Sequence, residues 1–433
     1  MSSELEPPLS SQHDDINGMP EPRESTQDLT VFTAVVFAVG EMAGSGVLTL
    51  PRALASTGWI GVPLHVVCAI ASAYTGILLG KCWLMVQARY REYRTNTRYP
   101  YPAIGFVTYG KIGRMIVSCS IDLTLFGVSV VYFVLASQNI QQLVRYAGKD
   151  ISFCIWLLIL AAALWPTSLL GTPKDFWPVS IGALISTSVA CILIVVKVTT
   201  DSGNAQPVSQ PHLETKDAFM AFGTLCFAFG GHAVFPTIQV DMKEPKKFGK
   251  AVFIAYFILV LMYLPVAIAG YVVYDTSVHD NILLNLSKGP ILYVVEVLIT
   301  MHIFFGFIIV INPVCQEMEA LVGVPSSFTY KRIVSRTVFM VLVLFVAETV
   351  PQFGVIMSLI GGSTTTLIIF VFPPIFYLKL CHMKGDWEEK KPSTAQKTAC
   401  GLIIFVGLVA GVASTYSAVD ALATSRFSKP CYI

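Results

Sequence analysis

The sequence has little charge: 13% of its 433 residues are Asp, Glu, Lys or Arg, against about 25% in soluble globular domains. It has no C-x-x-C pair and no His/Cys cluster with the spacing of a zinc site. Its net charge is only +2, without a basic block that contains interleaved aromatics. These absences argue against a water-soluble domain, a structural metal and a nucleic-acid partner.

Catalytic motifs are missing as well. The sequence shows no nucleophile and base in a known spacing, no phosphate-binding loop and no metal motif, which argues against an enzyme and against a bound cofactor. The ten cysteines do not indicate a disulfide framework, because half of them fall in apolar stretches, where thiols usually act as small hydrophobic groups. These are Cys68, Cys119, Cys191, Cys226 and Cys400.

Long apolar runs make up most of the chain. Hydrophobic residues account for 54% of it, and stretches of about 20 apolar residues, long enough to cross a hydrocarbon core of about 30 Å, recur along it. The pattern predicts an all-α integral membrane protein in contact with lipid, with eleven transmembrane helices. The predicted spans are residues 30–54, 61–86, 115–143, 153–170, 177–198, 218–239, 251–273, 291–311, 333–350, 353–378 and 399–422.

Polar segments flank this helical domain, which we place at residues 30–422. Residues 1–29 are mostly acidic or small and polar, which predicts a disordered tail. They lack the basic start and short apolar core of a cleavable signal peptide, so we expect the first apolar stretch to remain in the membrane. Residues 423–433 form a short tail at the other end.

The distribution of basic residues predicts the orientation. With the N-terminus in the cytoplasm, 20 Lys and Arg residues fall on the cytoplasmic side and 8 on the other, with Lys81 inside the second span. The positive-inside rule therefore favours a cytoplasmic N-terminus and an extracytoplasmic C-terminus. A glycosylation sequon at Asn285 falls in a loop that this orientation places outside. Both the plasma membrane and an endolysosomal or vesicular membrane fit this pattern.

Two predicted helices are interrupted near their middle. The first contains residues 44–51, GSGVLTLP, and the sixth contains residues 229–232, FGGH, followed by Pro236. Glycine permits unusual backbone angles and proline removes a hydrogen-bond donor, so a helix can unwind at these places. Unwound backbone persists at membrane depth only where it is buried in protein or lines a cavity.

The two breaks at corresponding positions predict an inverted repeat of five plus five helices with a binding site between them. The free N–H groups at the start of a half-helix would bind a carboxylate, and the exposed carbonyl groups would bind an ammonium. An amino acid zwitterion carries both of these groups. Close helix packing through small residues is the alternative explanation for one glycine pair alone. The predicted substrate-binding residues are Gly44, Ser45, Gly46, Gly230, Gly231 and His232.

The motifs resemble those of the amino acid/auxin permease family. Residues 44–51 followed by GWIG at 58–61 are similar to its first-helix signature, and YPAIG at 101–105 is similar to its loop before the third helix. Residues 222–245 are similar to its sixth-helix segment. The resemblance covers nearly all of the chain after residues 1–29. The family members that the chain resembles include the animal proton-coupled and vesicular amino acid transporters.

This resemblance implies a LeuT/APC-like fold, alternating access around the first and sixth helices, and secondary transport of neutral amino acids. Protons drive most members of the family and sodium drives one branch. Phe37 stands near the place of a first-helix histidine of the animal proton-coupled branch, so coupling by that histidine is not carried over. The extracellular disulfide of that branch is not expected either, because residues 201–217 contain no cysteine.

Ionisable residues within the predicted spans are the candidates for ion coupling, because such groups are costly in a membrane. Glu41 lies one helical turn before Gly44, and either exchanges a proton or braces the unwound segment. Asp122 either takes part in coupling or is a neutral acid bonded to nearby hydroxyls. The others are His232, which we expect to line the site, Glu296, and His302, which we expect to pack as a hydrogen-bonded side chain.

Two further features bear on function. Residues 363–366, STTT, make the tenth span polar, and their hydroxyls either line the path or bond back to helix carbonyls. The eighth span has no Ser or Thr between 302 and 311 to bind sodium, which favours protons as the coupling ion. The sequence thus predicts a proton-coupled transporter of small neutral amino acids. A sodium-coupled transporter and an amino-acid sensor on the same fold are the alternatives.

Overall fold

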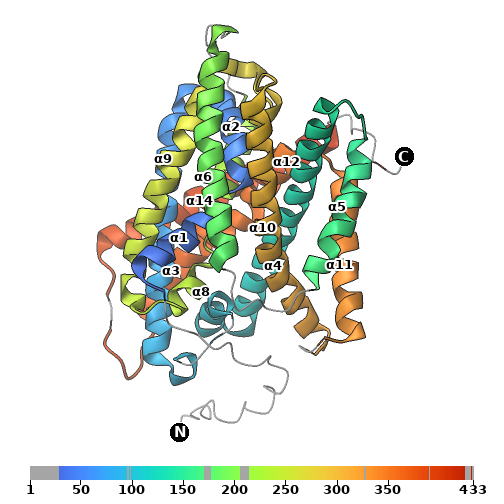
Figure 1. Ribbon diagram of the computed structural model, residues 1–433. Coiled ribbons are helices and arrows are strands. Elements are labelled where there is room, and N and C mark those ends of the chain that lie inside the picture. Colours follow the sequence, from blue (N-terminus) through green and yellow to red (C-terminus); the bar gives the residue numbers. More distant parts are fainter. Residues whose placement is uncertain are drawn as a thin grey trace, which may run out of the picture.

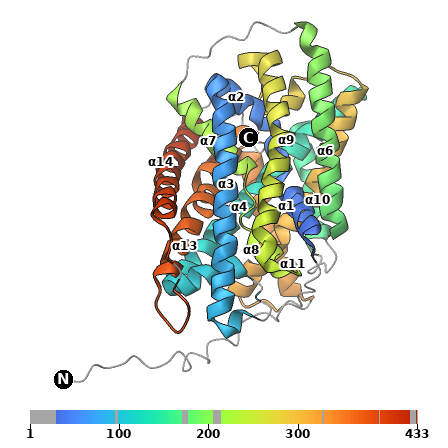
Figure 2. The ribbon, with the colours of Figure 1, turned by 90° about the vertical axis from the view of Figure 1, so that its left-hand side faces the viewer.

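The computed structural model describes residues 29–94, 97, 99–169, 177–204, 214–325, 328–389, 391–424 and 431. This part of the chain is almost entirely helical, with one isolated β-bridge between Leu29 and Met242. The tails expected at 1–29 and 423–433 lie outside it, apart from Leu29, residues 423–424 and Cys431. Figures 1 and 2 show the helices running side by side in one bundle, with α14 on its flank.

Three of the expected spans consist of more than one helical piece. The first comprises α1 (Val31–Met42), a 3₁₀ turn (Ser45–Thr49) and α2 (Leu50–Thr57). The sixth comprises α7 (Thr215–Ala228) and α8 (Phe235–Val240). The tenth comprises α12 (Phe353–Ile360), π-helical turns (Gly361–Thr365 and Leu367–Val371) and α13 (Phe372–His382). The two predicted breaks are therefore present, and the π-helical turns were not predicted.

The other spans are single helices: α3 (Gly61–Arg89), α4 (Pro100–Tyr146), α5 (Phe153–Ser168), α6 (Trp177–Thr200), α9 (Phe248–Tyr274), α10 (Pro290–Leu321), α11 (Tyr330–Thr349) and α14 (Thr394–Thr424). Seven helical stretches of the described chain are long and apolar enough to cross a membrane, and α1 and α5 are shorter apolar helices. The elements are compatible with the eleven expected spans. The predicted separation of the spans at 333–350 and 353–378 is confirmed, because α11 ends at Thr349 and α12 begins at Phe353.

The segment before the third span is helical, although the family resemblance indicated a loop there. Pro100 occupies the first turn of α4, where a missing N–H costs nothing. The helix then kinks at Tyr109 and Gly110, and Gly110 has a φ of +66°, which favours glycine. The kink brings the first part of α4 against the rest, since a Cβ on Gly105 would lie 2.7 Å from the Gly113 carbonyl oxygen.

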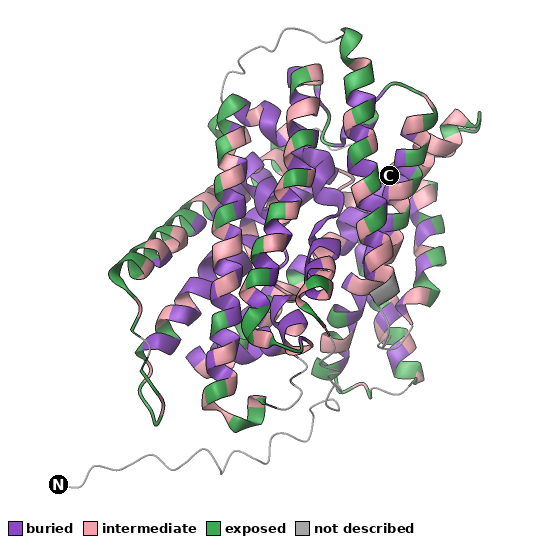
Figure 3. Ribbon diagram, turned by 60° about the vertical axis from the view of Figure 1, so that its left-hand side comes forward, coloured by how far each residue is buried: buried purple, intermediate pink, exposed green. Residues whose placement is uncertain are grey.

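The outer surface of the bundle is apolar, as membrane lipid requires. On α14, Leu402, Phe405, Val409, Val412 and Tyr416 are all more than half exposed and recur at helical spacing. Soluble monomers rarely expose such stripes. Figure 3 shows the buried residues gathered towards the middle of the bundle and exposed ones along the outer helices. The exposed apolar stripe of α14 is therefore suited to contact with lipid.

Two tyrosines of α9 bind the backbone at both helix breaks. The hydroxyl of Tyr263 donates to the carbonyl oxygen of Met42 at 2.7 Å, and that of Tyr256 donates to Phe229 at 2.9 Å. Both tyrosines are buried and lie seven residues apart, so they share one face of α9. An unwound carbonyl left unpaired in a membrane costs several kcal/mol. The Tyr256 bond avoids that cost at Phe229, and the Tyr263 bond adds to the one that the Met42 carbonyl accepts from the Gly44 N–H at 2.9 Å.

A buried ion pair joins α10 to α11. Arg336 has no exposed side-chain surface and binds Glu319 at 2.6 Å, with Arg332 3.7 Å from the same carboxylate. Arg336 also donates to Asn312 at 3.0 Å and to the carbonyl of Ser168 at the end of α5. The pair is satisfied by further hydrogen bonds, as a buried charge requires.

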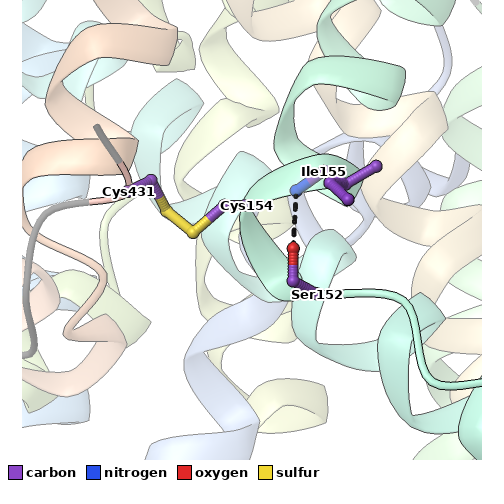
Figure 4. Close-up of a disulfide and its surroundings, with 4 residues drawn as sticks. All are labelled: Ser152, Cys154, Ile155 and Cys431. Atoms are coloured by element: carbon purple, nitrogen blue, oxygen red, sulfur yellow. Dashed lines mark hydrogen bonds between the residues drawn. A yellow bond between two sulfur atoms is a disulfide. The ribbon is translucent and has the colours of Figure 1, made fainter. Parts of the chain in front are cut away.

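A disulfide between Cys154 and Cys431 joins α5 to the end of the chain, a pairing across 277 residues that the sequence analysis did not foresee. Figure 4 shows it beside the first turn of α5, where Ser152 caps the helix by accepting a bond from the N–H of Ile155. None of the other eight cysteines forms a disulfide, and seven of them are buried.

We predict that Tyr263→Phe lowers the free energy of unfolding by about 0.5–1.5 kcal/mol, because the buried carbonyl of Met42 keeps the bond from the Gly44 N–H but loses the one from the tyrosine hydroxyl. The thermal midpoint of the purified protein in detergent measures the loss. Tyr416→Phe, at an exposed position on α14, is the matched control and should leave the midpoint unchanged. An equal midpoint for Tyr263→Phe and the native protein would show that this bond does not support the break.

Candidate functional site

The two helix breaks pack directly against each other. A Cβ on Gly46 would lie 2.8 Å from the Cα of Ala228, at the end of α7. A Cβ on Gly231 would lie 2.6 Å from the Met42 side chain, at the end of α1. The first contact is with backbone and so has little room to adjust, whereas the flexible methionine can move. Glycine at position 46 thus sets the distance between the two broken helices.

A cavity of about 70 Å³ lies between these breaks. The first broken helix lines it with Glu41, Met42, Gly44, Ser45 and Gly46, and the sixth with Phe227, Gly230, Gly231, Ala233 and Val234. A water molecule needs roughly 10–15 Å³ of such space. The cavity therefore has room for a small solute, and broken backbone forms much of its wall.

The remaining wall comes from α4, α10 and the π-helical turn of the tenth span. The α4 residues are Thr124, Leu125, Val128 and Tyr132, and the other two are Val310 and Thr365. Thr365 is buried, and its hydroxyl has no hydrogen-bond partner in the described chain. Its hydroxyl is therefore available to a ligand.

Five of the six predicted binding residues line the cavity, and His232 does not. The His232 ring is buried, and its Nε2 lies 3.0 Å from the hydroxyl of Thr75 on α3. This contact attaches the second break to α3. The binding roles of all six residues remain predictions.

The two predicted coupling residues differ in position. Glu41 lines the cavity, whereas Asp122 does not, although Thr124 two residues later on α4 does. Asp122 is half-buried and interacts electrostatically with Glu317 of α10. Glu296 is fully buried on α10 and is not among the lining residues. By position, Glu41 is thus the acidic residue that a solute in the cavity meets.

The hydroxyl cluster of the tenth span divides between its two expected roles. Ser363 donates back to the carbonyl of Leu359 at 2.6 Å, and Thr366 to that of Gly361 at 2.7 Å. The Thr364 hydroxyl accepts a bond from Thr124 at 2.7 Å, which joins this span to α4. Thr365 alone of the four lines the cavity.

The loop between α9 and α10 covers one end of the broken first helix. Its buried residues include Ile282 and Leu283, in a turn that contacts Ser45–Thr49. Arg52 of α2 donates to the carbonyl of Thr276 at 3.2 Å and lies 3.8 Å from Asp280. This exposed ion pair is worth little by itself, but the backbone contact fixes α2 to the loop.

Asn285 lies in the same loop, and both ends of its side-chain amide are bonded. Its oxygen accepts from the N–H of His279 at 2.8 Å, and its nitrogen donates to the carbonyl of Ser277 at 3.1 Å. These bonds give Asn285 a structural role in the loop. Its glycosylation remains a prediction.

Sequence reasoning missed the part of the site that comes from other helices. Tyr132 and Thr124 lie on a long apolar helix, and no motif distinguishes them from packed residues. Tyr256 and Tyr263 did carry a signal, because two tyrosines seven residues apart lie on one face of an apolar helix. Which carbonyls they bind depends on the packing of α9 against α1 and α7.

Comparison with known proteins agrees with this geometry. A family model described as transmembrane amino acid transporter protein matches residues 27–419. The amino acid transporter AVT1B of Arabidopsis thaliana is 29% identical over 405 residues, which cover 91% of this chain and 71% of that protein. AVT1H of the same plant is 26% identical, and the match covers 90% of each protein.

Solved structures reproduce the fold at low sequence identity. A mutant of the manganese transporter of Eremococcus coleocola matches with a TM-score of 0.59 and 13% identity, over 95% of this chain and 91% of that one. MhsT in complex with L-phenylalanine matches with a TM-score of 0.56 and 13% identity, over 92% and 100% of the two chains.

The family resemblance seen in the motifs and the LeuT-like helix arrangement are both confirmed by these matches. Since one family model accounts for nearly the whole chain, this multi-pass membrane protein belongs to the transmembrane amino acid transporter family, whose members are transporters and not enzymes.

Proposed function

We propose that the protein is a proton-coupled secondary transporter of small neutral amino acids, which works by alternating access around its broken first and sixth helices. The observation that carries the proposal is the cavity lined by Gly44, Ser45 and Gly46 on one side and Gly230 and Gly231 on the other. Relatives that match nine-tenths of this chain are named amino acid transporters.

The chemistry of the two breaks suits a zwitterion. The helical stretch that begins at Ser45 starts at the cavity, and the N–H groups of a first helical turn lack intrahelical partners and attract a carboxylate. The end of α7, near Phe227, presents carbonyl groups that attract an ammonium. An amino acid thus meets opposite partial charges at its two ends.

The size of the cavity favours a small side chain. A volume of about 70 Å³ leaves little space beyond the amino and carboxyl groups of a substrate. Glycine, alanine and proline are therefore the preferred substrates in this proposal, and Thr365 is the hydroxyl available to bind them.

Two features support protons as the coupling ion. The part of α10 from His302 to Ile311 has no Ser or Thr, so this segment offers no hydroxyl oxygen to a sodium ion. Glu41 lines the cavity beside the first break, where protonation of its carboxyl and binding of substrate influence each other.

Purified protein in liposomes tests the proposal directly. A panel of labelled amino acids, with pH and sodium gradients imposed separately, should show uptake of small neutral substrates driven by the pH gradient. Preference for aromatic substrates, or uptake that requires sodium and ignores the pH gradient, contradicts it. Saturable binding without any uptake would instead indicate a sensor on a transporter fold.

Gly46→Val should abolish uptake while the protein still inserts into the membrane. The new Cβ would collide with the backbone of Ala228, 2.8 Å away, and force the two breaks apart. Gly401→Val on α14, where a Cβ meets nothing within 4 Å, is the matched control. Uptake rates at equal amounts of inserted protein give the comparison, and normal uptake by Gly46→Val would remove the proposed site.

Glu41→Gln should keep substrate exchange but lose accumulation driven by a pH gradient, because an amide cannot carry a proton between the two sides. If Glu41 only braces the break, exchange and accumulation should fall together. Glu296→Gln, a buried residue outside the cavity lining, is the control. Proton-driven accumulation that persists in Glu41→Gln would contradict the coupling role of Glu41. Asp122 would then be the next candidate for that role.

The proposed orientation has the N-terminus in the cytoplasm, in the plasma membrane or an endolysosomal or vesicular membrane. The disulfide supports it, because both Cys154 and Cys431 then lie on the extracytoplasmic side, where disulfides persist. In a Cys431→Ser variant in intact cells or vesicles, we expect Cys154 to react with an impermeant maleimide from that side. Protection of Cys154 there, with reaction from the cytoplasmic side, would reverse the orientation.

A further inference from the structure

His302 of α10 has an unused ring nitrogen beside the first helix break. The side chain is 1% exposed, and its Nε2 has no hydrogen-bond partner in the described part of the chain. This nitrogen lies 2.8 Å from the place that a Cβ on Gly44 would occupy. Glycine at position 44 therefore leaves the room that the imidazole needs, and Nε2 points at the broken backbone.

The other ring nitrogen determines which tautomer is present. Nδ1 lies 3.2 Å from the carbonyl oxygen of Ala183 and 2.8 Å from the hydroxyl of Thr187, both on α6. We place the proton of the neutral imidazole on Nδ1, where it can be donated to the carbonyl of Ala183 or to the hydroxyl oxygen of Thr187. Nε2 consequently presents a lone pair, which binds a proton, whereas hard metal cations prefer oxygen.

Tyr132 of α4 connects this nitrogen to the cavity. Its ring packs edge-on against His302, with 6.3 Å between the ring centroids, and it lines the cavity. Its hydroxyl lies 3.5 Å from the same Cβ position of Gly44. Glu41 also lines the cavity and interacts electrostatically with Tyr132. A carboxyl, a phenol and an imidazole therefore follow one another from the cavity to the interface of α6 and α10.

We propose that His302 binds the coupling proton and receives it through the hydroxyl of Tyr132, an inference that rests on the proposed proton-coupled transport. The Tyr132 hydroxyl gives its proton to Nε2 and takes one from hydronium or from the Glu41 carboxyl, so the phenol is regenerated. The resulting imidazolium has two N–H groups, with Nδ1 facing α6 and Nε2 facing the first break. When Glu41 supplies the proton, its carboxylate balances the new charge.

The other side chains that face His302 are less suited to bind the coupling proton. On α6 the neighbours are Thr187, which does not titrate in this range, and the carbonyl of Ala183. On α9 the nearby titratable group is Tyr263, and its hydroxyl is already donated to Met42. Tyr132 is thus the titratable side chain that contacts His302 directly from a neighbouring helix.

Two measurements on liposomes test the proposal: substrate exchange without a pH gradient, and accumulation driven by an imposed one. His302→Asn keeps a donor near Ala183 but cannot bind the proton. We expect it to retain exchange at a reduced rate and to lose accumulation by at least about tenfold, the order of a typical coupling factor. Tyr132→Phe removes only the hydroxyl and should shift the ratio of accumulation to exchange in the same direction.

His65→Asn is the matched control, because His65 of α3 is also buried with an unpaired Nε2, but its ring packs against Phe229 and not against Tyr132. Its ratio should equal that of the native protein. Undiminished accumulation in His302→Asn, or a proportional fall of both activities, overturns the proposal. If His302→Asn does not fold, an unchanged ratio of accumulation to exchange in Tyr132→Phe overturns the proposal. Native protein without pH-driven accumulation would instead defeat the proposed coupling itself.

Discussion

The two hydrogen bonds from α9 to the broken helices are the interaction on which the rest of the structure depends. A membrane leaves no water for a free carbonyl, so a helix can open at mid-depth only if another part of the protein binds the released groups. Tyr263 binds Met42 and Tyr256 binds Phe229. Because both donors lie on one face of one helix, the first and sixth helices are held open by the same neighbour.

The two faces of α9 differ: one carries the tyrosines that contact the helix breaks, and the other is apolar and exposed. Between the two tyrosines and beside them, Phe253, Phe257 and Leu261 are more than half exposed. The helix therefore presents apolar side chains outward and polar tips inward, as a membrane helix that packs against broken backbone must. The glycine contacts at the breaks then bring α1 and α7 close enough to enclose a cavity of about 70 Å³.

The sequence predicted the helix breaks because glycine and proline act locally, through the backbone angles and hydrogen bonds of their own segment. It predicted five of the residues that line the cavity for the same reason. It did not predict Tyr132, the role of the α9 tyrosines, or the Cys154–Cys431 pair, because each depends on which helices become neighbours. His302 was expected to be a packed residue, and it is packed; only the structure shows that its free nitrogen faces Gly44.

Further contacts attach each half of the first helix to a different neighbour. Leu29, just before α1, exchanges backbone hydrogen bonds with Asp241 and Lys243, just after α8, at 3.0 Å each. The beginning of the first helix is thus attached to the end of the sixth. At the other end, Arg52 attaches α2 to the loop before α10. In the alternating access that we propose, the two halves of the first helix, joined at Gly44, would move with these different neighbours, and the movement would change the surroundings of both Glu41 and His302.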